Sequence, residues 1–294
     1  MAASDAEEPI QTYRDIAYLP TDGVYHQFDL YLPPGSTSAR PLVCFVHGGA
    51  WRSEDKSQHE ILARRIVSLT GYPVAIPNYR LTTPSTQLKH PAHAKDALDF
   101  LHFILDWEGP SGGAQVLYDA SRIFLCGHSC SAHMFTSIFL SPPNPDDSSA
   151  VLNPSQKLVA SVRGVVLSEG IYDIDLLLRS FPGYREWFIA PSFDDRLSYA
   201  SFNTLNYEFR QGVEHIRWLV IHSKGDTLVD EVQSEGIYKR LCALLQDCKD
   251  GNGNAALGSV ERYWDLTSEH NVILKEKEYP ELVSQFVLRD TTAK

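Results

Sequence analysis

Two short apolar segments that each run straight into a turn of small residues constrain the fold of this chain more than any other feature. Residues 42–46 lead into the block His47-Gly48-Gly49-Ala50-Trp51, and residues 122–126 lead into Gly127-His128-Ser129-Cys130-Ser131. Continuous apolar runs of this length are typical of buried strands. Glycines at the end of a strand let the backbone turn sharply and present its N–H groups to a ligand. The sequence therefore predicts two strands that each end in a turn suited to a functional site.

Strand and helix patterns alternate along the rest of the chain. Further strands are predicted at residues 73–77, 162–167, 217–222 and 260–264, and helical periodicity occurs at residues 60–67, 92–107 and 231–246. Most of the strands are continuous apolar runs, as expected of a parallel sheet that is covered on both faces. The alternation favours a doubly wound α/β fold. Residues 13–18 and 26–32, which flank an Asp-Gly turn, are expected to form an antiparallel hairpin at the sheet edge.

The length of 294 residues is compatible with a single α/β domain that spans residues 1–294. The segment 173–216 is too long for a simple crossover and is unusually rich in aromatic residues. We expect it to form an inserted cap over the carboxyl edge of the sheet, where such folds bind ligands. Surface loops are predicted at residues 109–114, 141–156 and 250–254, which are rich in turn-forming residues.

Composition excludes several classes of partner. The net charge of −11 argues against nucleic acid or an anionic membrane, because both require a basic surface. No apolar stretch approaches the ~20 residues that span a bilayer, and residues 1–11 lack the basic and apolar regions of a signal peptide. The five cysteines form an odd set that suits reduced thiols better than a disulfide framework. We therefore expect a soluble protein of the cytoplasm.

Ser129 is the candidate nucleophile. A serine attacks a carbonyl only if a base accepts its proton and if its side chain stands clear of the sheet. A strand–turn–helix elbow meets the second condition, and it requires small residues two positions before and after the serine. Those positions are Gly127 and Ser131, where the second is usually glycine. The alternative interpretation of Ser129 is an ordinary helix cap after a strand.

The acid of the site is expected after a later strand. Asp226 lies in the turn that follows residues 217–222, where it could orient a histidine and stabilise its cationic form. A turn aspartate that caps the next helix is the common alternative. Other carboxylates in comparable places are Asp230, Glu169 and Asp173.

His270 is the predicted base. Of the 11 histidines, only His215, His222 and His270 follow Ser129 by more than a few residues, and the first two flank the strand that carries the acid. The order nucleophile, acid, base along the chain belongs to the α/β-hydrolase fold. The N–H groups of Gly48, Gly49 and Cys130 would form the oxyanion hole. Removal of one such donor typically costs ~2.7–4 kcal/mol of transition-state stabilisation.

The segment around Ser129 also contains residues of other chemistries. Four potential metal ligands occur within eight positions, but they straddle a strand, a turn and a helix and contain no C-x-x-C pair, so no metal is expected: Cys126, His128, Cys130 and His133. No other cofactor is expected. Cys130 is not the predicted nucleophile because Ser129 occupies the apex of the elbow. Trp51 is interpreted as a packed support beside the oxyanion loop.

These motifs resemble the kynurenine formamidase (arylformamidase) family, in particular its fungal-type members within the HGGxW-containing branch of the α/β-hydrolases. The resemblance covers roughly residues 40–275 and rests on residues 47–51, 78–81, 170–184, 222–226 and 269–271. The segment 170–184 is the most specific, because many esterases share the HGGxW block. Ser131 departs from the family, in which glycine is usual at this position.

The resemblance implies hydrolysis of N-formyl-L-kynurenine to L-kynurenine and formate, a step of tryptophan degradation towards NAD. It also implies a small-molecule substrate and a homodimer. Arg52, Arg179 and Arg185 are the candidates for binding the substrate carboxylate. A broad carboxylesterase of the same fold is the nearest alternative, and a catalytically inactive binding module is the alternative from another class.

Overall fold

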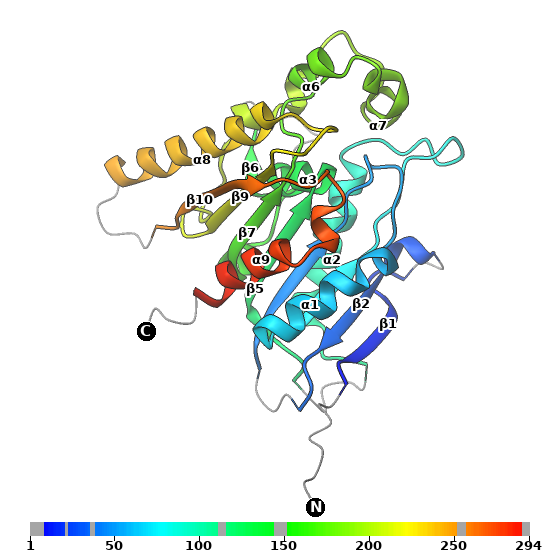
Figure 1. Cartoon of the computed structure of the whole chain (residues 1–294), viewed down its shortest axis with the longest axis vertical. Helices are drawn as coiled ribbons and strands as arrows, with labels where there is room; N and C mark the ends of the chain where they lie inside the picture. Colours follow the sequence, from blue (N-terminus) through cyan, green and yellow to red (C-terminus); the bar gives the residue numbers. More distant parts are fainter. Residues whose placement is uncertain are drawn as a thin grey trace, which may run out of the picture.

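A mostly parallel sheet of eight strands, with helices on both faces, forms the centre of the computed structural model (Figure 1). The structure describes residues 9–20, 23–35, 39–110, 116–143, 152–251 and 257–289. In spatial order the strands are β1 (Gln11–Ala17), β2 (Gln27–Leu32), β4 (Val74–Pro77), β3 (Pro41–Val46), β5 (Asp119–His128), β7 (Val162–Ser168), β9 (Arg217–Ser223) and β10 (Val260–Leu266). This architecture confirms the predicted α/β-hydrolase fold.

Parallel pairing runs without interruption from β4 to β10, whereas β1 and β2 pair antiparallel at one edge. The predicted edge hairpin therefore exists. Its register is broken between Tyr13 and Ile16, where Asp15 has a φ of 57°. β2 continues the antiparallel arrangement with β4, so the sheet is mixed only at this end.

The central strand β3 shows why its sequence is apolar without interruption. Leu42, Cys44 and Val46 belong to a core on one face of the sheet, and Val43 and Phe45 belong to a second core on the other face. Because successive side chains of a strand point to opposite faces, both cores draw on this one segment. All five side chains are fully buried.

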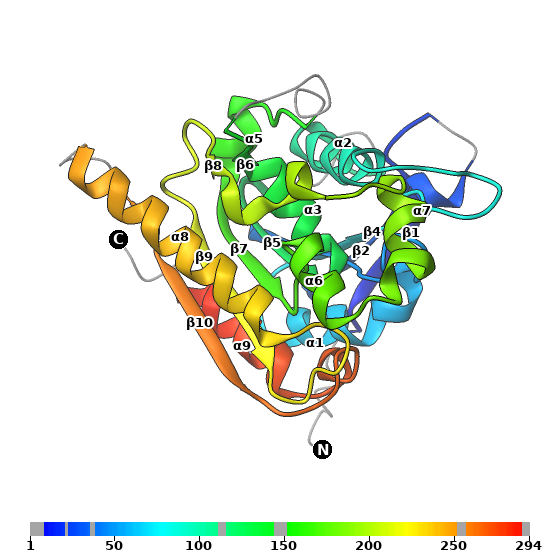
Figure 2. The same ribbon diagram turned by 90° about the horizontal axis from the view of Figure 1, so that it is seen from above.

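Helices form the two outer layers, which Figure 2 shows from above. On one face lie α1 (Glu60–Thr70) and α9 (Glu278–Leu288), which contact each other. The opposite face is covered by α2 (Ala92–Asp106), α3 (Cys130–Phe139), α5 (Gln156–Ser161) and α8 (Glu231–Gly251). The helix predicted at 231–246 extends to Gly251, so it includes the first residues of the loop expected at 250–254.

The predicted cap consists of short helices, single helical turns and one short strand. Residues 173–216 contain α6 (Ile174–Ser180), α7 (Ala190–Phe193), three single helical turns at 185–189, 200–202 and 204–206, and β8 (Glu208–Phe209), which pairs with β6 (Leu140–Ser141). Figure 1 shows α6 and α7 beyond one end of the sheet. Phe193 of α7 packs edge-on against Trp51, which follows β3, with ring centroids 4.9 Å apart. The segment therefore lies over the carboxyl ends of the strands.

Parts of the predicted loops, residues 111–114, 144–151 and 252–254, lie outside the described residues. The five cysteines form no disulfide, and Cys44, Cys126 and Cys130 are buried. In the described part of the chain, no helix has the length and apolar character needed to cross a membrane. The assignment of residues 1–294 to one domain stays a prediction.

Four of the buried histidines near the carboxyl ends of the strands have a pKa that burial lowers to about 3 or 4. The pKa falls to about 4 for His47 and His133 and to about 3 for His93 and His128. Each is neutral in the folded protein but binds a proton in the unfolded chain below about pH 6.5. Their contribution to stability is therefore complete above that pH and is lost as the pH falls towards 4.

We predict that the free energy of unfolding falls between pH 6.5 and 4 by about 1.4 kcal/mol per pH unit for each such histidine. The substitution His133→Gln should make this pH dependence shallower by about one proton, because it removes one of the titrating groups. The glutamine amide can still donate to the Phe202 carbonyl, which lies 2.9 Å from Nε2 of His133, so the variant should keep this hydrogen bond. Urea unfolding at pH 7, 6 and 5 measures the slope. An unchanged slope in the variant would contradict the prediction.

Candidate active site

Ser129 occupies the single position between β5 and α3. Its φ of 58° and ψ of −122° lie in a region that is unfavourable for residues with a side chain. The conformation is held on both sides, because the Ser129 N–H donates to the Ser168 carbonyl at 2.8 Å and its own carbonyl accepts from the Ala132 N–H at 3.1 Å. This strained strand–turn–helix geometry is that of a nucleophile elbow.

Ser131, the departure from the usual glycine, has a defined place in the elbow. Its fully buried hydroxyl donates to the Val46 carbonyl at 2.6 Å and accepts from the His128 N–H at 2.7 Å. It thereby joins the end of β3 to the end of β5. The elbow geometry at Ser129 is thus kept in the presence of a serine two positions later.

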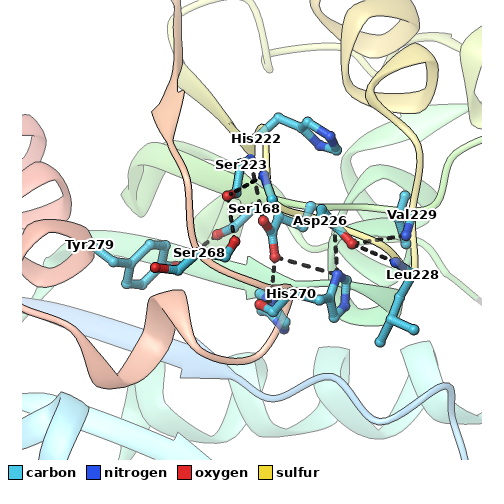
Figure 3. Close-up of polar contacts among 12 residues, drawn as sticks. Ser168, His222, Ser223, Asp226, Leu228, Val229, Ser268, His270 and Tyr279 are labelled. Atoms are coloured by element: carbon cyan, nitrogen blue, oxygen red, sulfur yellow. Dashed lines mark hydrogen bonds and ion pairs between the residues drawn. The ribbon is translucent and has the colours of Figure 1, made fainter.

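Asp226 and His270 are brought together by the loops after β9 and β10 (Figure 3). Nδ1 of His270 lies 2.7 Å from Oδ2 of Asp226, and Oδ1 of Asp226 accepts from the N–H groups of Leu228 and Val229 at 2.8 and 3.0 Å. Burial raises the pKa of Asp226, but these hydrogen bonds and the imidazole lower it overall. The ionised carboxylate requires the proton on Nδ1 of His270, which leaves Nε2 as a proton acceptor.

His270 also contacts the elbow. Nε2 of His128, the residue before Ser129, donates to the His270 carbonyl at 3.0 Å, and the two rings lie 4.6 Å apart between centroids. Ser129 and His270 are buried, with exposed fractions of 7% and 4%. The imidazole thus lies against the turn that carries the serine.

The glycine pair after β3 lies against the same turn. A Cβ atom on Gly48 would lie 3.1 Å from Cβ of Ser129, and one on Gly49, whose φ is +90°, would lie 2.2 Å from the Ser53 carbonyl oxygen. The Gly48 carbonyl accepts from the Tyr79 hydroxyl at 2.7 Å, so the peptide plane is fixed from behind. Position 49 therefore requires glycine, and a side chain at position 48 would crowd the turn that carries Ser129.

Cys130 links the loop to the helix. Its Sγ accepts from the Trp51 N–H at 3.3 Å, and its own N–H belongs to the first turn of α3, where backbone donors have no partner within the helix. In the described chain no hydrogen bond outside regular elements uses the N–H of Gly48, Gly49 or Cys130. Burial raises the pKa of the Cys130 thiol to about 12, so it stays protonated. The arrangement can hold a negative charge on an oxygen beside Ser129.

Of the carboxylates considered as alternatives to Asp226, two bond groups other than His270 and one lies beside it. Asp173 caps α6 through the Leu176 N–H at 2.9 Å, and Asp230 accepts from the Ser180 hydroxyl at 2.5 Å. Glu169, in contrast, lies in the site, with Oε2 3.3 Å from Nδ1 of His270. Its place directly after β7 is the sequence signal that points there.

The metal-ligand set considered from sequence does not assemble as such. Within the described ranges, one group of possible ligands comes together: His128, Glu169 and His270, with ligand atoms within 4.8 Å of one another. Two of these already bond protein atoms, because His128 donates to a carbonyl and His270 to Asp226. Hydrogen bonding accounts for the cluster.

An aromatic layer covers the loop that follows β3. Trp51 is fully buried, and it packs edge-on against His133 and Phe193 and at a tilt against Phe188. The predicted role of Trp51 as a packed support therefore agrees with its surroundings. Arg52 donates to the Trp187 carbonyl of the cap, and Arg185 pairs with Asp195.

Comparison with known proteins places these features in context. A model of the BD-FAE family matches residues 28–241. Kynurenine formamidase of Meyerozyma guilliermondii is 24% identical over 199 residues, which cover 66% of this chain and 68% of that protein. Kynurenine formamidase of Danio rerio is 25% identical over 176 residues (60% and 52%), and a probable isoprenylcysteine alpha-carbonyl methylesterase of Oryza sativa subsp. japonica is 28% identical over 171 residues (58% and 38%). The match spans about half of the zebrafish protein and less of the rice protein.

Solved structures share the fold. Esterase B from Lactobacillus rhamnosis, inhibited by a tributyrin phosphonate, superposes with a TM-score of 0.69 at 18% identity and covers 97% of this chain and 85% of that one. A truncated carbohydrate esterase from gut microbiota gives a TM-score of 0.68 at 18% identity and covers 99% of both chains.

The substitution Gly49→Ala is predicted to lower kcat/KM by about 10²–10³-fold, because the clash with the Ser53 carbonyl would turn an oxyanion donor away. Gly23→Ala is the matched control, because a Cβ atom there meets nothing within 4 Å. The hydrolysis of phenyl acetate measures both variants. Equal activity of the two would show that the loop is not part of the site.

The buried hydroxyl of Ser131 should contribute to stability. Ser131→Ala should lower the free energy of unfolding by about 1–3 kcal/mol, because the buried Val46 carbonyl and His128 N–H lose their partner. Ser137→Ala, on the same helix, should cost less, since that hydroxyl has only a 3.4 Å contact to His133. Urea unfolding decides, and equal losses would refute the bridging role.

Proposed function

This chain belongs to the BD-FAE family and to the kynurenine formamidase branch of the α/β-hydrolases, and we propose that it cleaves N-formyl-L-kynurenine to L-kynurenine and formate. Its membership and its relatives make it a hydrolase. The observation that carries the proposal of a serine mechanism is the 2.7 Å bond from His270 to Asp226, placed against a strained elbow with Ser129 at its apex.

In the proposed reaction Oγ of Ser129 attacks the formyl carbon while Nε2 of His270 accepts the hydroxyl proton. Asp226 stabilises the imidazolium, and the N–H groups of Gly48, Gly49 and Cys130 stabilise the oxyanion. The imidazolium then returns its proton to the departing aniline nitrogen. Water, activated by His270, attacks the formyl-serine and releases formate.

The geometry around Ser129 supports a small acyl group. The nucleophile is 7% exposed, and Trp51 with its aromatic neighbours encloses the loop beside it. A formyl carbon carries only hydrogen, so it is the acyl group that needs the least space beside this buried serine. The aromatic residues of the cap suit an aryl leaving group.

A broad carboxylesterase is the second candidate, favoured by the esterase structures and by the methylesterase relative. It requires the same residues and differs only in what the cap admits. A catalytically inactive binding module is disfavoured, because a binder has no need for nucleophile, acid, base and glycine loop together. We propose the cytoplasm as the location, since the three buried cysteines are free thiols; a homodimer is implied only by the resemblance.

The test compares the loss of N-formyl-L-kynurenine with the hydrolysis of phenyl acetate, on the wild type and on Ser129→Ala. We expect efficient formamide turnover and a loss of about 10⁴-fold or more in the variant. Mass spectrometry should find an organophosphate on Ser129. Efficient ester turnover without formamidase activity would favour the carboxylesterase, and failure of the organophosphate to label Ser129 would revive the binding module.

A further inference from the structure

Glu169 is a second carboxyl group at the histidine that Asp226 already holds. Its side chain is fully buried, and its Oε2 lies 3.3 Å from Nδ1 of His270 and 3.3 Å from Nε2 of His128. Oε1 accepts from the Ser223 N–H at 3.2 Å. The mechanism described above assigns no role to this group.

Its position is set by a strained backbone. Glu169 follows β7 with a φ of 48°, and its N–H donates to the Ile221 carbonyl of β9 at 2.9 Å. A non-glycine residue in this region costs free energy and persists only where the surroundings hold it. The turn aims the side chain between the β5 elbow and the loop that carries His270.

Two carboxyl groups can share one imidazole only if they do not both carry charge. Burial, and then the charge of Asp226, raise the pKa of Glu169 to about 9, so it holds a proton at neutral pH. The titratable groups that face it are His128 of β5, Asp226 after β9, His270 after β10 and Tyr279 of α9. Without the Asp226 charge, Glu169 would ionise at lower pH and become an anion beside Nδ1.

We propose that Glu169 is a second acid for His270, which helps to hold the imidazole in the wild type and takes over from Asp226 when that carboxylate is removed. The inference rests on the proposed roles of Ser129 and His270. Glu169 acts through the histidine and touches no reacting atom, so it is a positioning residue.

Four proteins test the proposal: the wild type, Asp226→Ala, Glu169→Gln and the double variant. The readouts are kcat/KM for phenyl acetate and the rate of organophosphate reaction at Ser129, from pH 5.5 to 9.5. Asp226→Ala should stay within about 100-fold of the wild type, against the ~10⁴-fold loss that is typical when the acid of such a triad is lost. Its activity should rise with pH through one ionisation.

The double variant should fall to about 10⁴-fold below the wild type and lose that ionisation. Glu169→Gln alone should stay within about 10-fold, because Asp226 remains and because the amide oxygen can still accept from Ser223. A purely structural role would lower activity by the same factor in both backgrounds and leave the pH profile unchanged, which would overturn the proposal. So would a loss of ~10⁴-fold in Asp226→Ala with no further loss in the double variant.

Asp230→Asn is the matched control, because it removes a neighbouring carboxylate that bonds Ser180 and not His270. It should leave the pH profile unchanged. If Asp226→Ala fails to fold, Asp226→Asn replaces it, because the amide oxygen can still accept from the N–H groups of Leu228 and Val229. Its activity should fall further when Glu169→Gln is added, and no further fall would refute the proposal. If the organophosphate does not label the wild type, the proposed function is wrong. If it labels Ser129 at the same rate in Asp226→Ala and in the double variant, only this inference is wrong.

Discussion

The left-handed backbone at Ser129 is the constraint around which this end of the molecule is arranged. A serine in that conformation costs free energy, and hydrogen bonds to the neighbouring strands offset this cost. β7 supplies the Ser168 carbonyl that fixes the Ser129 N–H, and β3 supplies the Val46 carbonyl that anchors Ser131. Both bonds exist because β5 is flanked by parallel partners whose carboxyl ends meet at one edge. The sheet thus holds the serine clear of the strands without help from the cap.

The remaining groups reach the elbow from loops that follow other strands. The glycine pair follows β3, Glu169 follows β7, Asp226 follows β9 and His270 follows β10. Residues separated by more than 200 positions in the chain therefore share one small volume, as ligand sites of parallel sheets do. Burial then strengthens each polar contact, because the carboxyl and imidazole groups of the site are shielded from solvent.

Much of this could be predicted from local sequence. Continuous apolar runs such as 42–46 and 218–221 specify buried parallel strands, and the pair Gly48 and Gly49 indicates a turn in which the backbone is closely approached. The pairing of His270 with Asp226 followed from their order along the chain. The place of Glu169 did not, because a carboxylate after a strand looks the same whether it points to solvent or to a histidine. The sequence shows Ser131 only as a departure from the usual glycine, because its two hydrogen bonds depend on how β3 and β5 end in the folded sheet.

The strand before His270 stands at the rim of the sheet. β10 pairs with β9 on one side only, and its register shifts between Tyr263 and Leu266, just ahead of the histidine. Rim strands open at lower free energy than central ones. Transient detachment of β10 would carry His270 away while Ser129 and the glycine pair stay in place after β5 and β3. Loss of turnover under mild denaturing conditions should therefore precede global melting and reverse on return to water.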